Sequence, residues 1–171
     1  VAIWALRLTP SLALGLPVMT GMANRLLTGI YGIAILGACM ALLVLFNHST
    51  LYMFSVMAIV WLADIGAYFS GKAFGKRKLA PSISPGKSWE GAIGGGIIVL
   101  LVSAATILVP ALSDTFAVQL YLKWGWLGFL AALILMVAAS IVGDLFESQL
   151  KRRAGMKDSS SLLPGHGGVL D

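Results

Sequence analysis

Long apolar segments alternate with short polar ones along most of this chain. A helix needs about 20 mainly apolar residues to cross a membrane. Four segments meet this requirement, at residues 26–46, 51–69, 92–112 and 124–146. The pattern therefore predicts an all-α, polytopic integral membrane protein with about four transmembrane helices and a polar, cytoplasmic active-site face.

The composition supports a membrane protein and narrows the classes of partner. The 171 residues are 58% hydrophobic and 11% charged, whereas a soluble domain carries about 25% charged residues. The net charge of +5 then indicates loops near anionic lipid or an anionic substrate, and no nucleic-acid partner is expected. The single cysteine, Cys39, lies in an apolar segment, which excludes an internal disulfide and a cysteine-based metal site.

The N-terminal segment, residues 1–21, is harder to assign. It is apolar but is interrupted by Arg7, Pro10 and Pro17, so it is either the end of an earlier span or an interfacial segment. The sequence begins at Val1 and lacks a signal-peptide pattern. We expect residues 1–171 to form one transmembrane catalytic domain of a longer polypeptide, with sequence missing at both ends.

Basic residues concentrate in two polar segments, one after the second predicted span and one after the fourth. They are Lys72, Lys76, Arg77, Lys78 and Lys87 in the first segment, and Lys151, Arg152, Arg153 and Lys157 in the second. The positive-inside rule places both segments in the cytoplasm. Two spans separate them, so they must share a side, and the topology is self-consistent.

The few acidic residues are informative, because carboxylates in a membrane segment are costly and usually face a partner, a water-filled cavity or an ion. Asp64 lies inside the second predicted span. It could form a structural ion pair with a basic residue of the following loop, or contact a substrate or metal.

A second acidic site follows the fourth span. On a helix, Asp144, Glu147, Ser148 and Lys151 stand at i, i+3, i+4 and i+7 and share one face. A solvated helix end with a Glu147–Lys151 ion pair is one interpretation, but it leaves Asp144 unexplained. The alternative is a catalytic face at the membrane boundary.

Asp144 and Asp171 suit a magnesium site. Mg²⁺ takes oxygen ligands and often binds one or two carboxylates together with substrate phosphates. The glycine-rich segment before Asp171 could deliver the second carboxylate. Lys151, Arg152 and Lys157 would then neutralise phosphate oxygens.

Two other metal- or phosphate-binding motifs are rejected. His166 has no second histidine or cysteine nearby at zinc spacing, so a hydrogen bond to phosphate or a role in ordering its loop is the better interpretation. The Gly-Lys-Ser triplet at 86–88 lacks the first glycine of a P-loop, which would stand five residues before Gly86.

Lys87, Ser88 and Glu90 stand at the start of the third predicted span. Free backbone N–H groups at a helix N-terminus favour a bound anion. These residues could therefore bind substrate, or the basic loop could serve only to set topology.

Two blocks of sequence resemble a known family, the phosphatidate cytidylyltransferases or CDP-diacylglycerol synthases. Residues 148–171 are similar to the family's C-terminal signature, S-x-hydrophobic-K-R, four residues, K-D, a short spacer and P-G-H-G-G-x-x-D. The matching positions are Ser148, Lys151, Arg152, Lys157, Asp158, Pro164, His166, Gly167, Gly168 and Asp171. Residues 61–91 resemble the preceding block through Asp64, Ala67, Tyr68, Gly71, Lys87 and Glu90.

The resemblance implies transfer of a cytidylyl group from CTP to phosphatidate, with Mg²⁺, in phospholipid biosynthesis at the bacterial inner membrane. Together with the shared helical face and the predicted magnesium site, it leads us to expect catalytic roles for Asp144, Ser148, Lys151 and Asp171, with Asp144 and Asp171 as metal ligands. The expected substrate-binding residues are Asp64, Lys87, Ser88, Glu90, Arg152, Lys157, Asp158, His166, Gly167 and Gly168. A second cation and self-association into a homo-oligomer are left open.

Two other functions stay open. A lipid-alcohol kinase of similar architecture would transfer only the γ-phosphoryl group of its nucleotide. A transporter would place paired charges or broken helices near the midplane, whereas the charges here concentrate at one membrane surface. Within the favoured function, we expect Lys87 to contact the lipid phosphate and the Asp144–Lys151 face to contact the triphosphate.

Overall fold

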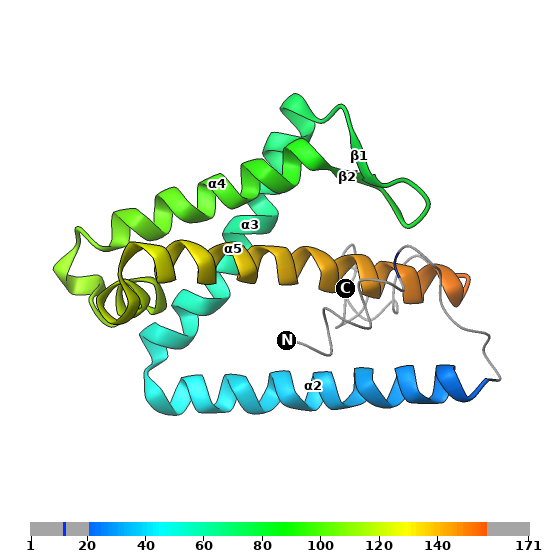
Figure 1. Ribbon diagram of the computed structural model, residues 1–171, viewed down its shortest axis with the longest axis horizontal. Coiled ribbons are helices and arrows are strands. Elements are labelled where there is room, and N and C mark those ends of the chain that lie inside the picture. The colour runs from blue at the N-terminus through cyan, green and yellow to red at the C-terminus, as the bar shows by residue number, and fades with distance from the viewer. Residues whose placement is uncertain (1–11, 13–20, 157–171) are drawn as a thin grey trace, which may run out of the picture.

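The described part of the chain folds into four long helices and one small hairpin (Figure 1). The structure is a computed structural model that describes residue 12 and residues 21–156. Its elements are α2 (Met22–His48), α3 (Thr50–Phe74), β1 (Lys78–Ala80), β2 (Ser84–Ser88), α4 (Trp89–Thr106), the short 3₁₀ helix η2 (Pro110–Leu112) and α5 (Phe116–Arg153). All four α-helices are long and apolar enough to cross a membrane, which confirms the predicted all-α polytopic fold.

Several helix boundaries differ from the prediction. Helix α3 continues to Phe74, beyond the predicted end at residue 69. Helix α4 ends at Thr106, earlier than expected, because proline cannot continue a helix and Pro110 instead begins η2. Helix α5 starts at Phe116 and changes direction at Gly125, whose positive φ of 63° favours glycine.

Helices α3 and α4 pack closely through small residues. A Cβ atom on Gly95 would lie 2.5 Å from the backbone oxygen of Ala63, and one on Gly91 would lie 2.7 Å from that of Ala67. Glycine is therefore required at both positions for the two backbones to approach this closely. These two glycines thus allow α4 to pack directly against α3.

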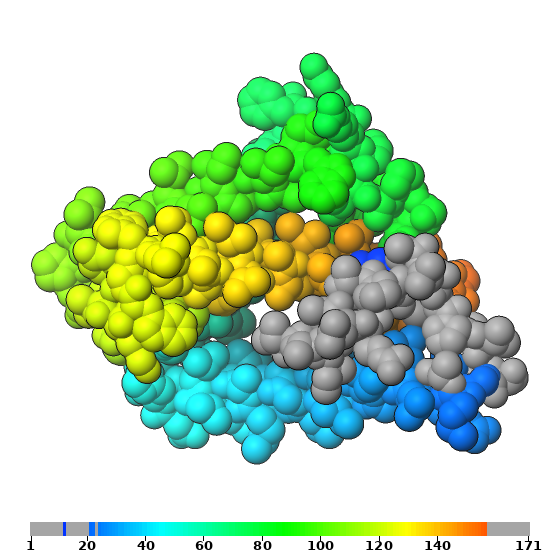
Figure 2. All heavy atoms as spheres, in the orientation of Figure 1, coloured from blue at the N-terminus to red at the C-terminus, as the bar shows by residue number. Residues whose placement is uncertain are grey.

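The buried core joins α3, α4 and α5. Ile59 of α3, Val99 of α4 and Phe129 and Leu133 of α5 are all almost inaccessible to solvent. Helix α2 forms a separate ridge in Figure 2, while α4 and α5 lie against one another. Helices α3, α4 and α5 therefore form the buried core of the described residues.

Helix α2 contacts the end of α5 through a few side chains. Arg153 donates a hydrogen bond of 2.9 Å to the side-chain oxygen of Asn24, and the rings of Tyr31 and Phe146 lie 5.7 Å apart. The start of α2, the hairpin and the end of α5 lie at the same end of the molecule (Figure 1). The basic segments around residues 72–87 and 151–153 therefore lie at the same end of the molecule, which is compatible with the predicted topology.

Candidate active site

A cavity of about 570 Å³ opens between α3, the β1–β2 hairpin, the start of α4 and the middle of α5. Its polar lining holds two carboxylates and three ammonium groups, from Asp64, Asp144, Lys72, Lys78 and Lys87. Residues separated by up to 80 positions in the sequence thus meet in one space. The first block of chemically dense sequence, residues 61–91, thus meets Asp144 of α5 in a single site.

The α3 side of this cavity is one helical face. Asp64, Tyr68 and Lys72 stand at i, i+4 and i+8, and all three line the cavity. The ammonium of Lys72 lies 5.9 Å from the centroid of the Tyr68 ring. Sequence reasoning selected Asp64 but did not assign Tyr68 and Lys72 to the site, although the helical spacing used for Asp144 would have grouped them.

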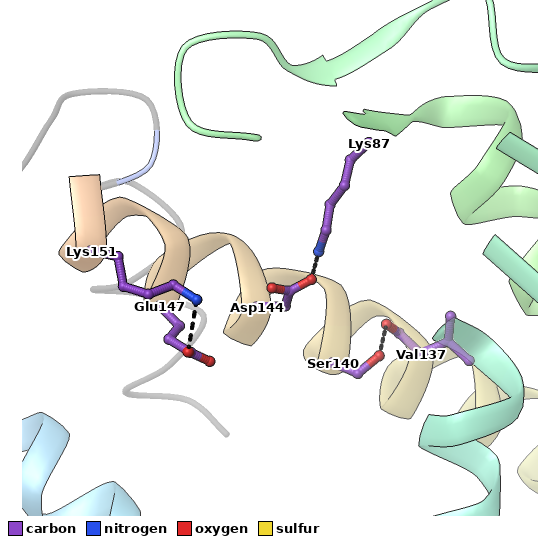
Figure 3. Close-up of polar contacts among 6 residues, drawn as sticks. All are labelled: Lys87, Val137, Ser140, Asp144, Glu147 and Lys151. Atoms are coloured by element: carbon purple, nitrogen blue, oxygen red, sulfur yellow. Dashed lines mark hydrogen bonds and ion pairs between the residues drawn. The ribbon is translucent and has the colours of Figure 1, made fainter. Parts of the chain in front are cut away.

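The opposite side is marked by an ion pair between Lys87 of β2 and Asp144 of α5 (Figure 3). The Lys87 side chain extends from the hairpin toward α5 and ends at the Asp144 carboxylate. The two side chains are 28% and 47% exposed, respectively. Burial lowers the pKa of Lys87, and the negative charges of Asp64 and Glu147 oppose that shift.

The proposed catalytic face of α5 is only partly inside the cavity. Asp144 lines it, whereas Glu147, Ser148 and Lys151 do not. Lys151 instead forms the expected i,i+4 ion pair with Glu147 at 3.2 Å (Figure 3). The Glu147–Lys151 ion pair of the first interpretation is therefore present, while Asp144 points to the hairpin (Figure 3). A catalytic role for this face stays a prediction.

Arg152 lies at a different hollow. Together with Ser82 and Arg153 it lines a space of about 340 Å³ between the hairpin turn and the end of α5. The structure therefore places Arg152 beside the hairpin but outside the main cavity. Its predicted contact with substrate stays a prediction.

Ser88 and Glu90 form hydrogen bonds with backbone groups at the start of α4 and just after α3. The buried hydroxyl of Ser88 accepts a hydrogen bond of 3.2 Å from the backbone N–H of Gly91, which is the usual N-cap arrangement. The Glu90 carboxylate accepts hydrogen bonds from the backbone N–H groups of Lys76 and Arg77. Ser88 also lines the cavity, whereas Glu90 does not.

The rest of the predicted site lies outside the described residues. These positions are Lys157, Asp158, His166, Gly167, Gly168 and Asp171. Within residues 21–156 there is no cluster of three or more metal-ligating side chains. However, Asp64 and Asp144 line the same cavity, and one or two carboxylates completed by substrate phosphates are a normal donor set for Mg²⁺. The residues present therefore fit that ion.

The arrangement suits an anionic amphiphile. Lys72, Lys78 and Lys87 supply positive charge, while Leu79, Val137 and Ile141 supply an apolar wall of the same cavity. The cavity lies where two candidate membrane helices, α3 and α4, meet the polar hairpin. A phosphate group could contact the lysines while its lipid body stays against the apolar wall.

Comparison with known proteins assigns the family. Residues 2–171 match the cytidylyltransferase family over almost the whole chain. The chain belongs to the cytidylyltransferase family. The resemblance seen in the two sequence blocks is therefore confirmed. No solved structure shows a significant match to the chain.

Several relatives of this chain are bacterial phosphatidate cytidylyltransferases. The chain is 57% identical over 117 residues to a phosphatidate cytidylyltransferase of Pseudomonas aeruginosa, which covers 68% of this chain and 40% of the relative. It is 51% identical over 124 residues to that of Haemophilus influenzae, covering 72% and 41%. With the Bacillus subtilis protein the identity is 44% over 125 residues, covering 73% and 43%. The chain thus spans about two fifths of the length of these relatives.

Proposed function

We propose that the protein containing this chain transfers a cytidylyl group from CTP to phosphatidate, giving CDP-diacylglycerol and pyrophosphate. The observation that carries the proposal is the convergence of Asp64, Asp144 and three lysines in one cavity at the polar end of candidate membrane helices. Relatives named phosphatidate cytidylyltransferase support it.

The cavity lysines would bind the lipid phosphate. A phosphate of phosphatidate is already ionised at neutral pH, so its oxygen can attack the α-phosphorus of CTP without a general base. Lys87 and Lys78 would hold that phosphate, while the apolar wall formed by Val137 and Ile141 would accommodate the adjoining lipid. Positive charge beside the reacting groups also offsets the charge that develops as pyrophosphate leaves.

The carboxylates supply ligands for a divalent cation. Asp144, with Asp64 beside the same cavity and Asp171 from outside the described residues, would hold Mg²⁺. When bound, the ion would neutralise the triphosphate and pyrophosphate oxygens. Lys87, which now pairs with Asp144, would be free to turn to the phosphate once another cation compensates that carboxylate.

The cavity is proposed to face the cytoplasm of a bacterial inner membrane. Basic residues concentrate at the hairpin and at the end of α5, which lie at the same end of the molecule (Figure 1), and cytoplasmic loops are enriched in Lys and Arg. CTP would then reach the site from the cytosol, and phosphatidate would enter from the inner leaflet.

Isotope transfer distinguishes this reaction from that of a lipid kinase. The intact protein in detergent micelles with phosphatidate and Mg²⁺ should transfer label to lipid from CTP labelled at the α-phosphorus. Label at the γ-phosphorus should leave with pyrophosphate. Transfer of the γ-label to lipid would support a kinase instead, and transfer of neither label would contradict the proposal.

A further inference from the structure

Glu90 closes the base of the hairpin that carries two of the cavity lysines. One of its carboxylate oxygens, Oε2, accepts hydrogen bonds from the backbone N–H groups of Lys76 at 3.1 Å and Arg77 at 3.2 Å. The other oxygen, Oε1, lies 3.3 Å from the Arg77 nitrogen. These donors follow the end of α3 at Phe74. A single side chain of α4 thus accepts the hydrogen bonds of two backbone N–H groups that directly follow α3.

The same junction is held by backbone contacts. The N–H group of Trp89 donates to the carbonyl oxygen of Arg77 at 2.9 Å, and the next residue, Lys78, pairs with Ser88 in the antiparallel register of β1 and β2. Lys87 directly precedes Ser88. The hydrogen bonds of Glu90 therefore lie next to the strand pair from which Lys78 and Lys87 enter the cavity.

Glu90 itself is poorly placed to bind substrate. It does not line the cavity, and its oxygens face backbone donors. A carboxylate would also repel an anionic phosphate. Its negative charge is not needed to accept hydrogen bonds from neutral N–H groups, so any acceptor oxygen at the same place could serve.

We propose that Glu90 is a positioning residue, which holds the β1–β2 hairpin in the register that places Lys78 and Lys87 in the cavity. It acts through the backbone of Lys76 and Arg77. This assignment replaces the sequence-based expectation that Glu90 contacts substrate. The role of the two lysines rests on the proposed function, but the fixing of the hairpin by Glu90 does not.

Three substitutions of Glu90 distinguish a positioning role from a role that depends on its negative charge. Glu90→Ala removes the acceptor. Glu90→Gln keeps an acceptor oxygen at the same reach without charge, and one oxygen already receives both N–H groups. Glu90→Asp keeps the charge but is one methylene shorter. If Glu90 positions the hairpin, Glu90→Gln should keep the parent amide exchange and KM, and Glu90→Asp should not. If Glu90 is a charged ligand of substrate, Glu90→Asp should keep them and Glu90→Gln should not.

The first readout is hydrogen–deuterium exchange of the intact protein in detergent, which needs no activity. In Glu90→Ala the amides of Lys76 and Arg77 should exchange about tenfold faster, as expected when the acceptor of a backbone hydrogen bond is lost. Glu90→Gln should exchange close to the parent rate. Asp114→Ala removes a carboxylate near the start of α5, and it should leave the hairpin amides unchanged.

The second readout is the apparent KM for phosphatidate, which should rise in Glu90→Ala and Glu90→Asp and recover in Glu90→Gln. Unchanged exchange in Glu90→Ala, or rescue by Asp but not Gln, would overturn the positioning role. If Glu90→Ala accelerates exchange but the parent protein makes no CDP-diacylglycerol, the positioning role is upheld and the proposed function is rejected.

Discussion

Lys87 offers the sharpest single perturbation, because its ammonium pairs with Asp144 inside the cavity. Exposed ion pairs contribute about 0–1 kcal/mol, whereas breaking a deeply buried pair costs about 3–5 kcal/mol. Here the side chains are 28% and 47% exposed, so water can solvate Asp144 after Lys87 is removed. Lys87→Ala should therefore destabilise the fold by about 1 kcal/mol or less.

The expected effect on substrate binding is larger. A charge-assisted hydrogen bond contributes about 1.5–3 kcal/mol, and each 1.4 kcal/mol corresponds to about a tenfold change in affinity. Lys72 and Lys78 line the same cavity and should retain part of the attraction for phosphate. We therefore expect Lys87→Ala to raise the apparent KM for phosphatidate about tenfold, at the lower end of that range.

Initial rates in mixed micelles test this by varying each substrate while the other is saturating. Lys87→Arg keeps the positive charge and should recover part of the loss. Lys123→Ala removes an exposed lysine at the far end of α5 and should leave both KM values unchanged. If Lys87→Ala raises the KM for CTP and not that for phosphatidate, the assignment of Lys87 to the lipid is refuted.

Three further changes test the metal, the topology and the helix packing. Asp144→Asn should lower turnover by orders of magnitude, because it replaces a charged metal ligand with a neutral side chain of similar size. Its elution from a sizing column should not change. Near-normal turnover at ordinary Mg²⁺ would exclude the metal-binding role. A cysteine at Ser82 should be labelled by an impermeant reagent only in inverted vesicles, and one at Ser113 only in intact spheroplasts, with the opposite result reversing the topology. Gly95→Ala, whose new methyl would meet the Ala63 oxygen at 2.5 Å, should destabilise the protein by about 1–3 kcal/mol, whereas Gly96→Ala, with its nearest neighbour at 3.9 Å, should be neutral in a thermal melt.

The four membrane helices could be predicted from the sequence because each is a long apolar segment. Their ends were less predictable, since they depend on local chemistry. Pro110 ended the third helix early, and Gly125 allowed a change of direction within α5. The hairpin was not predicted, because β1 and β2 are only three and five residues long and lack an alternating apolar pattern.

The site could be predicted in its residue types but not in its pairings. Helical spacing grouped Asp144 with Lys151, and yet Asp144 pairs with Lys87 while Lys151 pairs with Glu147. Spacing within one helix says nothing of what a neighbouring element brings to it. Lys87 and Asp144 line the same cavity, whereas Ser148 and Lys151 do not, so the expected division between a lipid block and a triphosphate block stays a prediction.

Whether both substrates meet in this cavity is tested most directly by thiol protection at Ala92, a cavity residue at the start of α4. In a Cys39→Ala background, Ala92→Cys should react with a small anionic thiosulfonate, drawn by the nearby lysines. CTP with Mg²⁺ and phosphatidate should each slow that reaction, and together slow it most. Ala111→Cys, exposed beyond α4, should react equally with and without substrates. Reaction at Ala92→Cys that neither substrate slows would show that transfer takes place elsewhere.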